Sequence, residues 1–131
     1  MKKLCLKLTG ALLLSTGLLV AGCASIQTDA SGSRVMVSPN KPPKGCKYLG
    51  QVVGNQGNFF TGAWTSNRNL EEGSMNDLRN QAGKMGGNYV QLVTNRAGNT
   101  GSMHEGTGGM QQTNVTNLGN AYACPEHSFN T

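Results

Sequence analysis

The first 22 residues limit most strongly which part of this 131-residue chain can fold. They begin with lysines at positions 2, 3 and 7, continue in an apolar run from Leu8 to Val20, and end in the small residues Ala21 and Gly22. This order is typical of a secretory signal peptide. The run is interrupted by Thr, Ser and Gly and is shorter than the roughly 20 apolar residues of a transmembrane helix, the alternative interpretation. We therefore expect residues 1–22 to be a leader.

The leader ends in the sequence Val20-Ala21-Gly22-Cys23, which resembles the lipobox of bacterial lipoproteins. The resemblance implies signal-peptidase cleavage between Gly22 and Cys23 and attachment of lipid, palmitate included, to the Cys23 terminus. Each buried methylene contributes ~0.8 kcal/mol, so such an anchor is effectively permanent. Because Ala24 rather than Asp follows, the sorting rule of Gram-negative cells implies the periplasmic side of the outer membrane. The alternative is a secreted protein with a chance cysteine at its cleavage site.

The formal charge of +5 points at first to a nucleic-acid partner. Three lysines leave with the leader, however, and the chain from Cys23 onward keeps eight basic and six acidic residues, a net charge of +2. The lysines at 41, 44 and 47 are spread through a proline-bearing segment. We therefore expect no nucleic-acid binding, and we predict no small-molecule substrate and no cofactor.

The cysteines predict one disulfide. Cys5 leaves with the leader and Cys23 carries lipid, so that Cys46 and Cys124 are the thiols left in an oxidising compartment. We expect them to pair, because a small exported domain commonly depends on such a covalent link. Metal ligation and a reactive free thiol are the alternatives, but no CxxC motif or nearby histidine pair supports them.

Hydrophobic patterns divide the mature chain into a tether and one domain. Residues 23–33 are small and polar and predict a flexible tether, and residues 34–131 predict a single periplasmic domain. Within it we expect a helix that is capped by Asn69, carries an apolar stripe and ends at Gly86. The stripe consists of Met75, Leu78, Ala82 and Met85.

We expect four β-strands in the domain, over residues 34–37, 46–54, 88–94 and 115–124. The first is predicted at a sheet edge, and the second presents Tyr48 with Val52 on one face and Leu49 with Val53 on the other. The last is predicted to bulge at Gly119, and residues 95–113, rich in Gly and Asn, predict a mobile loop. The fold class is therefore α+β, with one amphipathic helix on a small, mainly antiparallel sheet, one disulfide and Gly/Asn-rich loops.

Few residues have the spacing of a functional site. Asp77 and Arg79 on the helix and Trp64 in an aromatic-bearing loop, with Phe59 and Phe60, are candidates for partner binding, although a solvated helix face and a lid over the core are the favoured explanations. The sequence does not support a metal site, an acid-base pair, a catalytic nucleophile or a phosphate-binding loop. The residues that could form such a site lie in segments without a catalytic motif. These residues are His104, Glu105 and His127; Ser102; and Gly106, Gly108 and Gly109.

Three segments of the mature chain resemble a family of bacterial lipoproteins known as domain of unknown function 4156. The segments are CKYLGQVVG at 46–54, GSMNDLRNQAGKMGGNYV at 73–90 and GNAYACP at 119–125. The resemblance implies no activity or ligand. More distantly, the order of a cysteine, LGxVxG, a helix and an apolar strand is similar to the outer-membrane sensor lipoproteins of the Rcs envelope-stress pathway, although those have four cysteines in the domain and a long basic linker.

These observations predict a lipid-anchored envelope lipoprotein with a structural or partner-binding role rather than an enzyme. The membrane is its expected partner through the anchor, and an envelope protein is a possible second partner. The alternative is an envelope-stress sensor that signals to a membrane protein, and an enzyme is the third reading.

Overall fold

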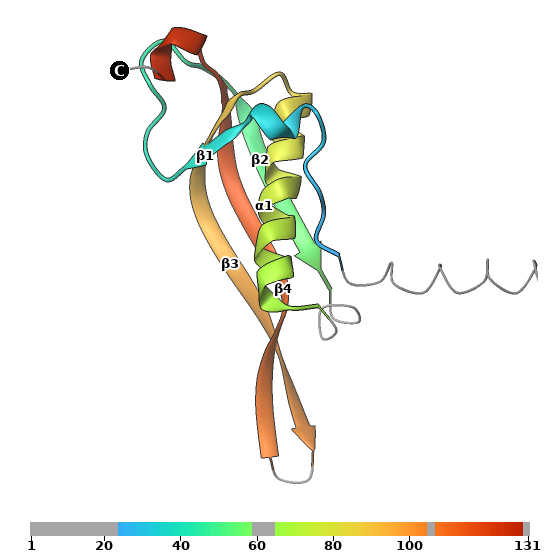
Figure 1. Cartoon of the computed structure of the whole chain (residues 1–131). Helices are drawn as coiled ribbons and strands as arrows, with labels where there is room; N and C mark the ends of the chain where they lie inside the picture. Colours follow the sequence, from blue (N-terminus) through green and yellow to red (C-terminus); the bar gives the residue numbers. More distant parts are fainter. Residues whose placement is uncertain (1–23, 59–64, 105–106, 130–131) are drawn as a thin grey trace, which may run out of the picture.

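The computed structural model describes residues 24–58, 65–104 and 107–129 (Figure 1). The leader, Cys23 and the aromatic residues Phe59, Phe60 and Trp64 lie outside these ranges. The elements in chain order are the 3-10 helix η1 (Gly32–Arg34), β1 (Met36–Ser38), β2 (Lys47–Gly57), the helix α1 (Asn67–Lys84), β3 (Tyr89–His104), β4 (Thr107–Ala123) and the 3-10 helix η3 (Glu126–Phe129).

The strands form one four-stranded sheet in the order β1-β3-β4-β2, and α1 packs on one of its faces (Figure 1). β4 pairs antiparallel with β2 and with β3, whereas β1 pairs parallel with β3. The predicted α+β class is therefore confirmed, with a mixed sheet. β1 lies at the edge, as the sequence predicts, and begins two residues later than expected.

The core forms where α1 meets the sheet. Leu78 and Ala82 of the predicted stripe are completely buried and Met75 packs against the core, but Met85 is 42% exposed. The buried face instead continues toward the N-terminus through Leu70 and Ser74. A spacing of four residues keeps these side chains on one side of a helix, whereas Met85 is the C-cap residue at the end of α1.

Both ends of α1 have capping groups. Ser66, not Asn69, is the N-cap, and its side chain accepts a hydrogen bond from the backbone N–H of Asn69. The predicted C-terminal cap at Gly86 is confirmed by its φ of 81°. The backbone N–H groups of Gly86 and Gly87 donate to the carbonyls of Gly83 and Ala82, each at 2.9 Å. This pair of bonds is the Schellman motif.

The predicted faces of β2 are wrong because of a β-bulge. The register with β4 shifts between Tyr48 and Gly50, which adds a residue and reverses the alternation of side chains. Tyr48 and Val53 are consequently exposed, at 53% and 42%, whereas Val52 is buried and Leu49 packs against the core.

The sequence pattern predicts a bulge at Gly119 of β4, but the bulge at this point of the sheet lies in β3. In β3 the register shifts between Leu92 and Thr94, opposite Gly119, so that β3 rather than β4 carries the extra residue. Gly119 has a packing role instead, because a Cβ atom there would clash with the side chain of Val90. The absence of a side chain at Gly119 leaves room for the side chain of Val90.

The predicted mobile loop at residues 95–113 is wrong. Residues 95–104 and 107–113 extend β3 and β4 into a long antiparallel hairpin, with pairs that run from Asn95↔Asn117 to His104↔Thr107 and a further register shift between Gly98 and Asn99. Figure 1 shows this hairpin projecting beyond the N-terminal end of α1. Backbone hydrogen bonds form the ladder of an antiparallel pair, so Gly-rich strands can pair without an apolar pattern that would reveal them.

Candidate functional site

The segment that precedes the sheet is not a flexible tether. Residues 26–32, here called the strap, run along α1 and lead into η1 (Figure 1). The backbone N–H of Ile26 donates to Oε1 of Gln56 at 3.2 Å, and the side-chain amide of Asn76 donates to the carbonyl of Ile26 at 2.9 Å. The domain thus holds the chain only three residues after Cys23.

Asn80 makes the central contacts of the strap. Its side-chain amide donates to the carbonyl of Gln27 at 2.9 Å, and its oxygen accepts from the backbone N–H of Asp29, also at 2.9 Å. Asn76 and Asn80 are each only 8% exposed. Buried amides are costly without hydrogen-bond partners. The strap, which covers these two amides, also supplies their partners.

The strap lies on the side of α1 opposite the sheet. At about 100° per residue, Asn76 and Asn80 lie about 160° from Leu78, the centre of the buried face. Gly83 belongs to the same outer stripe, and a Cβ atom on it would lie 2.5 Å from the backbone of Ser31. A Cβ atom on Gly32 would likewise clash with the side chain of Asn80. Two glycines therefore allow the strap and the helix to come into backbone contact.

Asp29 holds the turn at the end of the strap. Its carboxylate accepts hydrogen bonds from the Ser31 hydroxyl at 2.6 Å and from the backbone N–H groups of Ser31 and Gly32 at 2.9 and 2.8 Å. The bond from the Ser31 side chain, then that from the Gly32 backbone, lower the pKa of Asp29 below its usual value of 3.8. Hydrogen bonds to a carboxylate favour its charged form.

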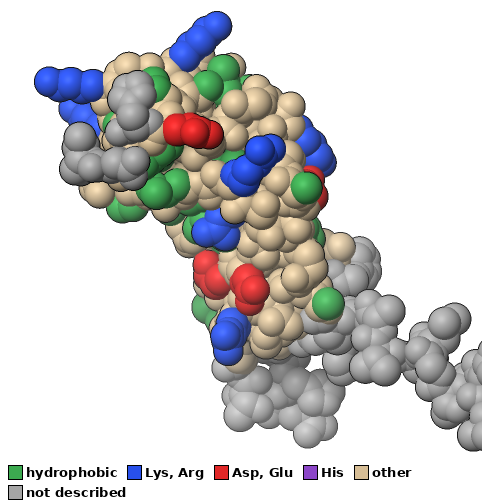
Figure 2. Space-filling model, turned by 45° about the horizontal axis from the view of Figure 1, so that its top comes forward, with side chains coloured by type: hydrophobic (Ala, Val, Ile, Leu, Met, Phe, Trp, Pro, Cys, Tyr) green, Lys and Arg blue, Asp and Glu red, His purple; other side chains and the backbone are tan. Residues whose placement is uncertain are grey.

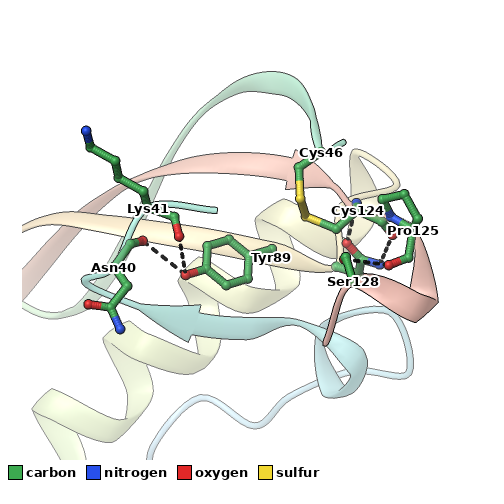
Figure 3. Close-up of a disulfide and its surroundings, with 8 residues drawn as sticks. Asn40, Lys41, Cys46, Tyr89, Cys124, Pro125 and Ser128 are labelled. Carbon is green, nitrogen blue, oxygen red and sulfur yellow. Dashed lines mark hydrogen bonds between the residues drawn. A yellow bond between two sulfur atoms is a disulfide. The ribbon is translucent and has the colours of Figure 1, made fainter. Parts of the chain in front are cut away.

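The end of the sheet away from the His104↔Thr107 end of the β3–β4 hairpin, here called the disulfide end, is closed by Cys46 and Cys124 (Figure 3). Their Cα atoms lie 4.1 Å apart and join the start of β2 to the residue after β4, 78 positions later, so the predicted disulfide is confirmed. Asn88 binds the same point: its side chain accepts from the N–H of Cys124 and donates to its carbonyl, each at 2.8 Å.

An aromatic pair covers the sheet at the disulfide end, on the face away from α1. Tyr89 is 3% exposed and stacks on Phe129 of η3, with 6.2 Å between ring centroids. Its hydroxyl donates to the carbonyl of Asn40 at 3.0 Å (Figure 3). The segment after Cys124 therefore folds back as a cover through residue 129, and residues 130 and 131 lie outside the described part.

Exposed cations gather toward the disulfide end. Lys44 and Lys47 flank Cys46, and Lys84 and Arg34 lie at the adjoining end of α1 and in η1. Elsewhere on the face seen in Figure 2, basic and acidic side chains alternate and apolar ones are scattered. Such a mixed surface is typical of a solvated protein face.

The predicted partner-binding residues on α1 have internal contacts. Asp77 accepts a hydrogen bond from the backbone N–H of Asn55 in β2 at 2.9 Å. The guanidinium of Arg79 donates to the oxygen of Asn76 at 3.1 Å, which orients the Asn76 amide toward the strap. The two residues thus support the sheet and the strap, and partner binding by them stays a prediction. Trp64 lies outside the described residues.

The residues considered for catalysis fall in different elements of the described part of the chain. Ser102 and His104 fall in β3, Gly108 and Gly109 in β4, and His127 in η3. Glu105 and Gly106 lie outside the described ranges. Within those ranges, no group of three or more His, Cys, Asp or Glu residues is placed to hold a metal ion.

Two shallow cavities of about 390 and 400 Å³ lie on either side of Phe129. The first is lined by Arg34 and Glu126 beside the glycines that end α1, and the second by Met36 and Lys41. Both are shallow, unlike the enclosed and mostly apolar clefts of typical ligand sites. The sequence analysis did not predict the strap. The signal for it is a helical stripe without apolar residues, formed by Asn76, Asn80 and Gly83 at offsets of four and three.

The fold and these contacts define a small disulfide-bonded α+β domain with an N-terminal strap. The chain belongs to the family described as Domain of unknown function (DUF4156), whose profile matches residues 26–124. The match begins at the first residue hydrogen-bonded to Gln56 and ends at the second cysteine of the disulfide. The family therefore comprises the strap as well as the sheet and helix.

Relatives with the name "Uncharacterized protein YjeI" occur in Escherichia coli K12, in Escherichia coli O6:H1 and in Shigella flexneri. Each is 34% identical to this chain over 83 residues, which cover 63% of this chain and 71% of the relative. No solved structure matches the chain.

Proposed function

We propose that this protein is an exported lipoprotein, anchored through lipid on Cys23 to the periplasmic side of the outer membrane, with a structural or partner-binding role. The disulfide between Cys46 and Cys124 is the observation that carries the proposal. Such bonds persist in the periplasm and are rare in the reducing cytosol. The lipobox-like Val20–Cys23 then explains how an exported domain would be retained.

The use of polar side chains within the domain supports a non-catalytic role. Asp29 caps a turn, Asp77 binds the β2 backbone, and Glu71 accepts from the amides of Asn95 and Gln112 at 3.2 and 3.1 Å. These carboxylates hold a turn and connect secondary-structure elements.

No helix in the described ranges is long and apolar enough to span a membrane. Cys23→Ala tests the proposed lipid attachment directly. We expect the wild-type protein to incorporate labelled palmitate and to have a mature mass that begins at an acylated Cys23, whereas Cys23→Ala should do neither. Cys5→Ala is the matched control, because Cys5 leaves with the leader. An unacylated wild-type terminus, or one that begins elsewhere, would disprove the anchor.

The partner-binding role requires a separate experiment. Crosslinking in intact cells, followed by purification of the acylated protein, should recover a reproducible envelope protein. Recovery of an inner-membrane signalling protein would favour the stress-sensor alternative. Absence of any partner at several crosslinker lengths would leave the structural role.

A further inference from the structure

The distance between the proposed anchor and the folded domain is short. Only Ala24 and Ser25 separate Cys23 from Ile26, the first residue of the strap. Three residue steps span at most roughly 10 Å in extended chain. The headgroup region of one leaflet is itself about 5 to 7 Å thick. Ile26 must therefore lie at or near the headgroups if Cys23 carries lipid.

The strap transmits this constraint to the whole domain because it is bonded to α1 and β2. Four hydrogen bonds hold it: one to Gln56, one from Asn76 and two with Asn80. The close contact between Gly83 and the backbone of Ser31 also packs the strap tightly against α1. The domain thus has no long flexible linker on which to rotate or to rise from the membrane.

The strap also determines which side of the domain is near the anchor. It covers the side of α1 opposite the sheet, while the far face of the sheet has exposed side chains at Tyr48, Gln51 and Val53. Leu118 and Asn120 lie beside Val53 and Gln51 in the ladder, and with them form what we call the uncovered face. Where the strap is bonded to Asn80, the helix, about 10 to 12 Å across, lies between the strap and the sheet, so this face is farther from the strap than the outer side of α1 is.

We infer that the strap orients the domain on the phospholipid surface, with the strap and outer side of α1 against the headgroups and the uncovered face toward the periplasm. The inference rests on the proposed lipid anchor at Cys23. Ile26 supports it, because this apolar side chain is 38% exposed at the strap end closest to the anchor. Interfacial apolar side chains favour the boundary between headgroups and acyl chains.

The competing orientation places the disulfide end on the membrane, where Lys41, Lys44 and Lys47 would meet anionic lipids. The strap opposes it. Ile26 lies beside Asn76, whereas the disulfide end lies beyond Lys84, eight residues or about 12 Å farther along the helix axis. The lysine-bearing loop would reach the membrane only if the strap left α1.

The experiment uses the acylated mature protein in vesicles of phosphatidylethanolamine and phosphatidylglycerol. A phosphatidylethanolamine with a photoreactive diazirine on its headgroup is the probe, and mass spectrometry locates the crosslinked residues. We expect adducts on strap residues such as Ile26 and Gln27 and on the outer side of α1. We expect none above background at Tyr48, Val53 or Asn120.

Two variants separate the strap from the anchor. A flexible Gly-Ser insertion of about ten residues between Ser25 and Ile26, with an r.m.s. span of about 17 Å, leaves the strap intact but should abolish the preference for one face. Asn76→Ala with Asn80→Ala should release the strap and add adducts at Lys41–Lys47. Gln91→Ala with Asn120→Ala removes two amides from the sheet face opposite α1 and is the matched control, which should keep the wild-type pattern.

The failures of the inference and of the proposed function are distinguishable by mass. If the protein is acylated at Cys23 but adducts occur equally on both faces, or mainly at the lysines, the orienting role is wrong and the anchor stands. The same conclusion follows if the Gly-Ser insertion leaves the adduct pattern unchanged. If Cys23 carries no lipid, the proposed function is wrong, and the inference falls with it.

Discussion

The side-chain amide of Asn80 donates to the carbonyl of Gln27 across 53 residues of sequence, at 2.9 Å. The contact joins the outer side of α1 to a segment that precedes every strand of the sheet. It adds a layer of chain to the helix on the side where an amphipathic pattern predicts solvent. α1 therefore has two buried sides, an apolar one against the sheet and a polar one beneath the strap.

Leu78→Asp should test the apolar side of α1. Leu78 is completely buried, so the substitution removes core packing and buries an unpaired carboxylate. We expect the free energy of unfolding to fall by about 3 to 5 kcal/mol in urea titrations. Gln81→Asp, at an exposed position of the same helix, should cost less than about 1 kcal/mol. Equal effects of the two substitutions would mean that this face of the helix is not in the core.

Gly83→Ala should test the strap side of α1. Alanine favours a helix interior by about 1 kcal/mol over glycine, but the added Cβ would lie 2.5 Å from the Ser31 backbone. We expect a net loss of about 1 to 3 kcal/mol and faster amide hydrogen exchange in residues 26–32. Lys84→Ala, at the exposed neighbouring position, should leave this exchange unchanged. Unaltered strap protection in Gly83→Ala would contradict the close backbone contact.

Removal of the disulfide should bring the domain close to its unfolding threshold. The bond closes a loop of 78 positions, for which the chain-entropy model gives about 4.5 kcal/mol. We expect Cys46→Ala with Cys124→Ala to lower the free energy of unfolding by up to about that amount, a large part of the stability of a small domain. Addition of reductant should destabilise the wild-type domain in the same way and leave the double variant unaffected. Two free thiols in intact oxidised protein would contradict the bond.

Acid should loosen the strap through Asp29. Since the folded pKa of Asp29 lies below its usual value of 3.8, the stabilisation is fully present above that value and is lost as the pH falls through the folded pKa. We expect amide exchange at Ser31 and Gly32, corrected for intrinsic rates, to accelerate as the pH falls below 3.8 and through the lower folded pKa. Asp29→Asn should remove this pH dependence, because an amide does not titrate there. A dependence that persists in Asp29→Asn would assign it to another group.

The helix, its C-terminal cap, the edge strand and the disulfide could be predicted from sequence because each leaves a local or countable signal. Leu78 and Ala82 repeat with the helical period, Gly86 marks a left-handed cap, and the thiols of Cys46 and Cys124 have one possible pairing. The candidate site was less accessible. Asp77 and Arg79 stood out as charges, but their hydrogen bonds to Asn55 and Asn76 are made within the domain.

The sequence by itself determined the α+β class and the helix residues Leu78 and Ala82 of its core, because helical hydrogen bonds and side-chain periodicity are local properties. Only the tertiary structure decided the length of the β3–β4 hairpin, the bulges beside Tyr48 and Leu92 and the position of the strap. Each of these depends on backbone groups that pair with residues distant in sequence. Backbone N–H and carbonyl groups are nearly the same in every residue, so their choice of partner leaves little trace in the order of side chains.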